Sequence, residues 1–307
     1  MGHLSGVIAA TPTPVGPDGE IDHDRLIRHC RWLLDDGGCD GVNLLGTTGE
    51  ATSFSVEQRI AAMRAVAASG LPLDRMMVGT GASALSDAVA LTSAARELGF
   101  NGALLLPPFY YKGIDAESLA DYVGEVIGWA GQSGLKLYLY HIPQNTGVPY
   151  PTEALAKLLE RYPGTIAGLK DSSGDLAFSR ALAEKFLGFD VFPSSEGSLT
   201  EWKSSGFAGC ISATTNITGR LSQIAWSEPE SQRGREAAAA AMAIRTVLGS
   251  FPLMASVKAA LTAMTDEPGW ERLMPPLRVL SPDERQQLLD RLEATEFANF
   301  EPFADVR

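Results

Sequence analysis

The chain has 307 residues, of which 45% are hydrophobic and 20% are charged, proportions that exclude a disordered, collagenous or repeat-biased protein. Its 25 Lys and Arg residues against 37 Asp and Glu give a net charge of −12, and such an acidic surface repels nucleic-acid phosphates and anionic lipid headgroups. We therefore expect neither nucleic acid nor a membrane surface among its partners.

The cysteines and the apolar runs predict where the protein works. Cys30, Cys39 and Cys210 are three in number and lack the spacing of a disulfide framework or a zinc site. The longest apolar runs have the length of a strand, well below the roughly 20 residues that cross a bilayer. No charged segment precedes the first apolar run, as it would in a secretion signal. We expect a cytoplasmic protein.

Short apolar runs alternate along the chain with segments of helical periodicity. The runs lack polar alternation, so each has to be covered on both faces, which is typical of strands in a parallel sheet. The segments between them repeat apolar residues every three to four positions, as at Leu26, Cys30 and Leu33. The eight predicted strands are 6–10, 41–45, 76–79, 102–106, 135–140, 165–169, 190–192 and 208–211.

Eight strand-helix units are complete by about residue 215, which matches the size of a (β/α)₈ TIM barrel. A doubly wound open sheet fits less well, because it usually has fewer strands and a Gly-rich phosphate turn. We predict a catalytic barrel over residues 1–220. Helical patterns at 235–248, 253–264 and 282–294 predict a helical C-terminal appendage over 221–307, packed on the barrel.

Active sites of such barrels gather at the C-terminal ends of the strands, which selects the polar residues that follow or end each apolar run. Four segments meet this criterion and should face one mouth. They are Gly46–Glu50, Pro107–Tyr111, Tyr140–Pro143 and Lys170–Ser173.

Lys170 ends an apolar run, where partial burial would free its amine for attack on a carbonyl and allow a Schiff base. An ion pair with Asp171 or Asp175 at the barrel rim is an equally good interpretation of its position.

The Gly46–Glu50 turn offers hydroxyl and backbone N–H groups to a small anion, or it caps the helix that begins near Ser55. Tyr140 and Tyr110 have side chains that relay protons, although packing is the commoner role of a tyrosine.

Two short stretches add to these four segments, since Thr146-Gly147 follows the third and Gly168-Leu169 precedes Lys170. Taken together, they resemble the dihydrodipicolinate synthase / N-acetylneuraminate lyase family of class I aldolases. The resemblance covers about residues 6–216 and extends to the helical tail. It implies a lyase or aldolase without a cofactor that combines pyruvate or another 2-keto acid with an aldehyde, or dehydrates a small 2-keto acid. It also implies a homo-oligomer, either a dimer or a tetramer.

The resemblance also implies roles for individual residues. Lys170 would form the imine, and Thr47, Tyr140 and Tyr110 would relay protons. The second tyrosine commonly enters from a neighbouring subunit in this family, and Tyr111 is the alternative to Tyr110. Thr48 would hold the pyruvate carboxylate, and the carbonyl of Ile211 would lie near the imine. The remaining expected substrate contacts are Ser172, His141, Asn145 and Glu196.

A metal-dependent aldolase is not expected. The four histidines, His3, His23, His29 and His141, show no ligand spacing. We predict that His23 and His29 lie on the outer face of the first helix, exposed to solvent or capping it.

Three departures from the family pattern limit the substrate. Asn145 stands where the synthase branch has an arginine that grips a substrate carboxylate, and His141 stands where that branch has asparagine. Glu196-Gly197 replaces the Asp-Glu pair with which the sialate-cleaving branch binds sugar hydroxyls. Because a carboxamide lacks the charge and the reach of a guanidinium, 4-hydroxy-tetrahydrodipicolinate synthase is only an alternative. A non-catalytic barrel that binds a keto acid is another.

Overall fold

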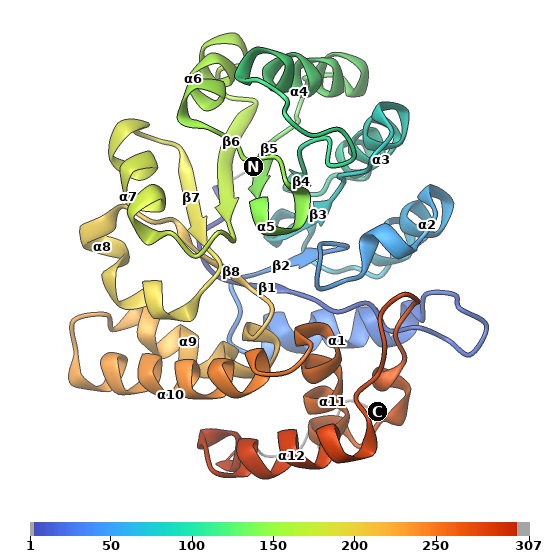
Figure 1. Ribbon diagram of the computed structural model, residues 1–307, viewed down its shortest axis with the longest axis vertical. Helices are drawn as coiled ribbons and strands as arrows, with labels where there is room; N and C mark the ends of the chain where they lie inside the picture. The colour runs from blue at the N-terminus through green and yellow to red at the C-terminus, as the bar shows by residue number, and fades with distance from the viewer. Residues whose placement is uncertain (1–2, 300–307) are drawn as a thin grey trace.

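The computed structural model describes residues 3–299 and shows eight parallel strands in the order β7-β6-β5-β4-β3-β2-β1-β8, with β7 beside β8 (Figure 1). The strands thus form a nearly closed barrel, and the predicted TIM-barrel architecture is confirmed. They are β1 (Gly6–Ala10), β2 (Gly41–Leu44), β3 (Met76–Gly79), β4 (Gly102–Leu105), β5 (Leu137–His141), β6 (Ile166–Asp171), β7 (Asp190–Pro193) and β8 (Gly209–Ser212).

Helices surround the barrel and continue beyond it at the C-terminal end of the chain (Figure 1). The helices between and after the strands are α1 (His23–Asp35), α2 (Val56–Ala68), α3 (Leu85–Leu98), α4 (Ala116–Ala130), α5 (Pro143–Thr146), α6 (Thr152–Arg161), α7 (Leu176–Lys185), α8 (Trp202–Ser205) and α9 (Thr215–Ser227). The appendage contains α10 (Gln232–Gly249), α11 (Leu253–Thr265) and α12 (Pro282–Glu293). Short 3₁₀ helices are η1 (Ala51–Ser53), η2 (Leu73–Arg75), η3 (Glu196–Glu201), η4 (Pro268–Glu271) and η5 (Glu296–Asn299).

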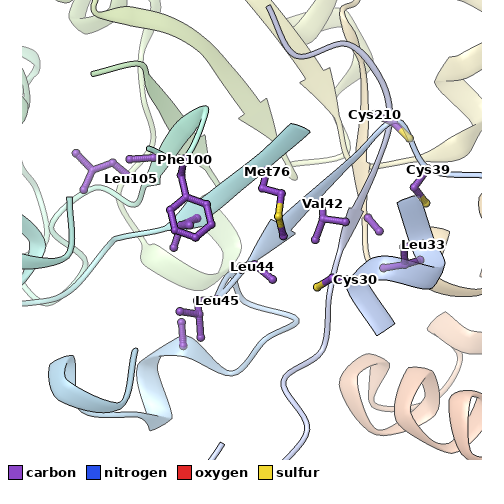
Figure 2. Packing of buried hydrophobic residues seen from close by; sticks show 14 of the residues in the cluster. Cys30, Leu33, Cys39, Val42, Leu44, Leu45, Met76, Phe100, Leu105 and Cys210 are labelled. Atoms are coloured by element: carbon purple, nitrogen blue, oxygen red, sulfur yellow. The ribbon is translucent and has the colours of Figure 1, made fainter. Parts of the chain in front are cut away.

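Side chains alternate between the barrel interior and the layer beneath the helices, as the two-residue period of a strand requires. The outer layer is a continuous apolar core, in which Cys30 and Leu33 of α1 lie near Val42 and Leu44 of β2 (Figure 2). The interior holds a separate cluster of Leu4, Ile8, Ala10, Met77, Leu104, Tyr138, Tyr140, Ile142, Ala167, Phe192 and Ile211. Tyr140 therefore faces inward, while its strand neighbour Leu139 packs outward.

Strand boundaries differ from the predicted ones where pairing continues into polar sequence. Lys170 and Asp171 lie within β6, because they stay in register with Tyr140 and His141 of β5. Lys170 is thus held by a strand on each side, since Phe192 of β7 is its other partner.

The three predicted C-terminal helices are present, and α10 and α11 pack against α9. The division into units 1–220 and 221–307 stays a prediction; position 220 lies inside α9, and residues 300–307 lie outside the described part of the chain.

The prediction of an outward-facing His29 is wrong. Its side chain is buried, its Nε2 lies 2.8 Å from Oδ1 of Asn216, and its ring meets Trp270 edge-on at 5.0 Å. Burial lowers the pKa of His29 to about 4, against the raising effects of Asn216 and Glu267. The C-terminal segment that carries Trp270 covers this part of α1, which the helical periodicity alone does not show.

Within residues 3–299, no single helix is long and apolar enough to cross a bilayer, and α10 with α11 passes that test only as a pair bent by 116°.

Candidate active site

Lys170 lies at the centre of the candidate site. Its side chain is only 4% exposed, and its Nζ lies 4.4 Å from the centroid of the Tyr140 ring. Asp171 instead accepts hydrogen bonds from the backbone of Ser173 at 2.8 Å and from Ser179 Oγ at 2.7 Å. Asp175 caps α7. Among residues 3–299 no carboxylate forms an ion pair with Lys170, so the rim ion pair is not the arrangement found.

Tyr140 connects this lysine to the turn after β2. Thr47 Oγ1 lies 3.3 Å from the Tyr140 hydroxyl, within hydrogen-bond distance. Burial acts to raise the pKa of Tyr140, but the charge of Lys170 and hydrogen bonds with Thr47, Ser172 and Lys170 outweigh it and leave this pKa lowered. The phenol is therefore more than a packing group, because its environment favours release of its proton.

The Gly46–Glu50 turn is held in an unusual backbone conformation. Leu45 and Glu50, which flank its central residues, have positive φ values of 51° and 54°, a conformation that side chains other than glycine adopt at a cost. The backbone N–H groups of Thr47 and Thr48 donate no hydrogen bond within residues 3–299. Ser55 and Gln58 form the capping box of α2 themselves. The turn is thus left free to receive a ligand rather than used as a helix cap.

A buried ion pair fixes the end of this turn. Glu50 and Lys258 of α11 have fully buried side chains that contact each other directly. Lys258 Nζ also donates to the carbonyl of Arg272 at 2.7 Å, and Glu50 accepts from the backbone N–H of Met274 at 2.7 Å. Burial lowers the pKa of Lys258, although Glu50 acts to raise it. The C-terminal helices therefore support the site directly.

A cavity of about 320 Å³ opens between this turn and β5. Thr47, Tyr140 and Asn145 line it with polar groups. The rest of the lining is mostly backbone and apolar side chains, including Leu45, Ala51, Leu104, Leu106, Phe109, Ile142, Met254, Pro276 and Leu277. Among the described residues that line the cavity, Glu50 is the charged one, and Lys258 already neutralises it.

The other predicted site residues fall into two groups. Ile211 lies inside the barrel, and the backbone N–H of Ser172 donates to the carbonyl of His141 at 2.8 Å. The His141 ring itself lies in the outer layer, where Nδ1 accepts from the backbone of Tyr150 at 3.0 Å and the ring lies 4.8 Å from that of Phe178. The structure does not bring the His141 ring to Lys170.

Tyr110 and Tyr111 are 75% and 72% exposed and lie against each other, with ring centroids 5.5 Å apart. Within residues 3–299, neither forms a hydrogen bond or ring contact with Tyr140 or Thr47 of the same chain. The loop after β4 thus presents two large aromatic side chains to solvent beside the mouth.

Glu196 belongs to a polar cluster that sequence reasoning only half identified. Its carboxylate is fully buried and bonds to Thr214, Thr218 and Arg245. Arg245 was missed because it lies 49 residues further along the chain and follows no strand. Asn43 was also missed; it is buried near the end of β2, and in the described part of the chain neither of its side-chain polar atoms has a hydrogen-bond partner.

No group of three His, Cys, Asp or Glu side chains with the arrangement of a metal site is found in the described range 3–299.

Comparison with known proteins places this geometry in a family. The model of the Dihydrodipicolinate synthetase family matches residues 3–295. The chain belongs to this family. The family uses pyruvate with aldehyde substrates, and the chain is a member of this family of class I lyases and aldolases.

Individual relatives show how far the similarity extends. An uncharacterized DapA-like lyase of Chloroflexus aurantiacus is 36% identical over 271 residues, which are 87% of this chain and 89% of that protein. The dihydrodipicolinate synthase structure from Agrobacterium tumefaciens has a TM-score of 0.87 at 28% identity, covering 94% and 99% of the two chains. YagE of E. coli K12, solved in complex with pyruvate, has a TM-score of 0.85 at 22% identity, covering 95% and 99%.

Replacing Lys258 with methionine should lower the free energy of unfolding by about 3–5 kcal/mol, because Glu50 would be left buried without its partner. Urea unfolding followed by circular dichroism measures this. The matched control is Lys203→Met, which removes an exposed lysine 3.7 Å from Glu230 and should cost less than about 1 kcal/mol. Equal effects of the two substitutions would contradict the anchoring role of Lys258.

Proposed function

We propose that the protein is a Schiff-base lyase or aldolase in which Lys170 forms an imine with pyruvate or another small 2-keto acid. The observation that carries this proposal is the position of the Lys170 amine, buried inside the barrel, without a carboxylate partner and over the Tyr140 ring. An incoming carbonyl has no ion pair to displace. A buried ion-paired lysine would support a structural role instead.

The proposed reaction needs only groups that the chain supplies. The neutral amine of Lys170 adds to the C2 carbonyl, and loss of water gives the imine. Once protonated, the imine takes up the electron pair released when C3 loses a proton, or when the C3–C4 bond breaks as the C4 hydroxyl loses its proton and the C4 fragment leaves as an aldehyde. The resulting enamine carbon then attacks an aldehyde in the synthetic direction, or takes up a proton in the cleavage direction. Hydrolysis of the final imine returns the free amine.

Proton movement in these steps is assigned to Tyr140 and Thr47. The lowered pKa of Tyr140 and its 3.3 Å contact with Thr47 support a relay between lysine and solvent. We assign the third position to Tyr110 of a second copy of the chain, with Tyr111 as the alternative, because both rings are exposed beside the mouth. This assignment requires a homo-oligomer, a dimer or a tetramer.

The carboxylate of the keto acid is assigned to Thr48 and the free N–H groups of the turn. The Ile211 carbonyl, Ser172 and Asn145 complete the proposed contacts. Pyruvate bound to the related YagE structure supports a 2-keto acid as one substrate, and the family's use of aldehydes supports an aldehyde as the other. We place the enzyme in the cytoplasm, in agreement with its three buried free cysteines.

Synthesis of 4-hydroxy-tetrahydrodipicolinate is the second candidate, since synthases are among the similar proteins. Asn145 argues against it, because the cavity that it lines offers no unpaired cation for the carboxylate of aspartate semialdehyde.

Borohydride added with pyruvate should trap one adduct per chain on Lys170, because the reagent reduces the imine to a stable secondary amine. Peptide mass mapping locates it. Lys170→Met should abolish the adduct while the circular dichroism spectrum stays that of a folded barrel. An adduct on Lys112 or Lys258 instead, or none, would overturn the proposed function.

Condensation of pyruvate with aspartate semialdehyde should be slight, and Asn145→Arg should raise it by about tenfold or more, as a charge-assisted hydrogen bond of about 1.5–3 kcal/mol predicts. A coupled assay of both proteins measures this. Gln144→Arg places the same charge one residue away and should not reproduce the gain. Synthase turnover in the unmodified protein as fast as with its best aldol substrate would make the second candidate correct.

A further inference from the structure

A second polar cluster lies on the opposite side of the barrel mouth from the cavity. It consists of Glu196 at the start of η3, Ser212 at the end of β8, Thr214 at the N-cap of α9, Thr218 within α9, and Arg245 of α10. Because η3 follows β7 and Thr214 follows β8, the cluster lies at the C-terminal ends of these strands. Lys170 lies at the same end of β6, the neighbour of β7.

Glu196 is not accessible to a substrate. One carboxylate oxygen accepts from the hydroxyls of Thr214 and Thr218, the latter at 2.9 Å, and the other accepts from Arg245 at 3.0 Å. The residue is 0% exposed. A carboxylate bonded in this way fixes the guanidinium against it, so Glu196 acts as a positioning residue for Arg245.

Arg245 is the accessible member of the cluster. All its recorded hydrogen bonds use Nη1, which contacts Glu196, Ser212 at 2.9 Å and Thr214 at 3.0 Å. No hydrogen bond of Nε or Nη2 is found within residues 3–299, and its side chain is 27% exposed. One edge of the guanidinium fork is thus anchored, while the other is left for a planar anion.

The two sides of the mouth therefore differ in what they can recognise. On the side of β2 to β5, the cavity is mostly apolar, and Asn145 supplies an uncharged amide. On the side of β7 and β8, Arg245 supplies a preorganised donor pair whose long side chain is already ordered by three contacts. An arginine held in place loses little further conformational freedom on binding a ligand.

We propose that Arg245 is a specificity-determining residue that binds a carboxylate at the far end of the substrate, so that the preferred 2-keto acid or aldol product is a dicarboxylate. This inference rests on the proposed function, which places the 2-keto carboxylate at Thr48 and the carbonyl carbon at Lys170. It identifies the substrate class that neither Asn145 nor the cavity selects.

Two matched pairs of 2-keto acids test the proposal. 2-Oxoglutarate and 2-oxopentanoate differ only in ending with a carboxylate or a methyl group, and 2-oxoadipate and 2-oxohexanoate differ in the same way with one more carbon. Isothermal titration calorimetry gives each dissociation constant. In at least one pair the carboxylate should bind about tenfold or more tightly, equivalent to about 1.4 kcal/mol.

The variants isolate Arg245 from the stability of the cluster. Because Arg245→Gln alone leaves Glu196 buried and unpaired, the main variant is the neutral double substitution Glu196→Gln/Arg245→Gln. Arg245→Lys keeps the ion pair but loses the planar fork. Arg235→Gln, which removes an exposed arginine elsewhere on α10, is the control.

The double variant should abolish the preference within each pair, Arg245→Lys should reduce it, and Arg235→Gln should leave it unchanged. The ratio within a pair cancels general effects of a substitution on keto-acid binding. No preference in the unmodified protein, or a preference that survives in the double variant, would overturn the role of Arg245. Failure of borohydride to trap pyruvate on Lys170 would count against the proposed function alone, because calorimetry does not depend on trapping.

Discussion

The Lys170 amine occupies the interior of the barrel without a carboxylate partner among the residues that the structure describes, and the rest of the site is arranged around that fact. A buried charge is normally paired, because an unpaired one is costly in a medium of low polarity. Here the amine contacts Tyr140 instead, whose hydroxyl hydrogen-bonds to it and whose ring centroid lies 4.4 Å from Nζ, a cation–π contact of modest strength. Both acidic neighbours in sequence face elsewhere, since Asp171 points to the outer layer and Asp175 caps a helix. The lysine is therefore free to react with a carbonyl.

The turn that faces Lys170 has a strained backbone, so contacts from outside the barrel have to hold it in place. Leu45 and Glu50 adopt left-handed backbone conformations, which persist only where surrounding contacts stabilise them. The buried contact of Glu50 with Lys258 and the hydrogen bond from Met274 provide such contacts, and both come from the C-terminal appendage. On the other side of the mouth, α10 carries Arg245. The appendage thus shapes two sides of the site.

The sequence predicts the barrel well because strands buried on both faces leave a pattern that the chain itself displays. The alternation of side chains along β5 also explains the position of His141. Because Tyr140 faces inward, the next residue, His141, has to face outward, and the sequence alone could have shown this. The buried His29 and the Glu196–Arg245 pair could not be predicted in this way. Each depends on a distant segment of the chain. The segment with Trp270 covers His29, and α10 brings Arg245 to Glu196, and the local sequence pattern shows neither contact.

A crystal structure of the protein soaked with pyruvate tests the central claim most directly. The account predicts continuous electron density from Nζ of Lys170 to C2 of the ligand, with the pyruvate carboxylate against Thr48 and the adjoining backbone N–H groups of the turn. Pyruvate bound at this mouth without a covalent link to Lys170, or a covalent adduct on another lysine, would contradict it.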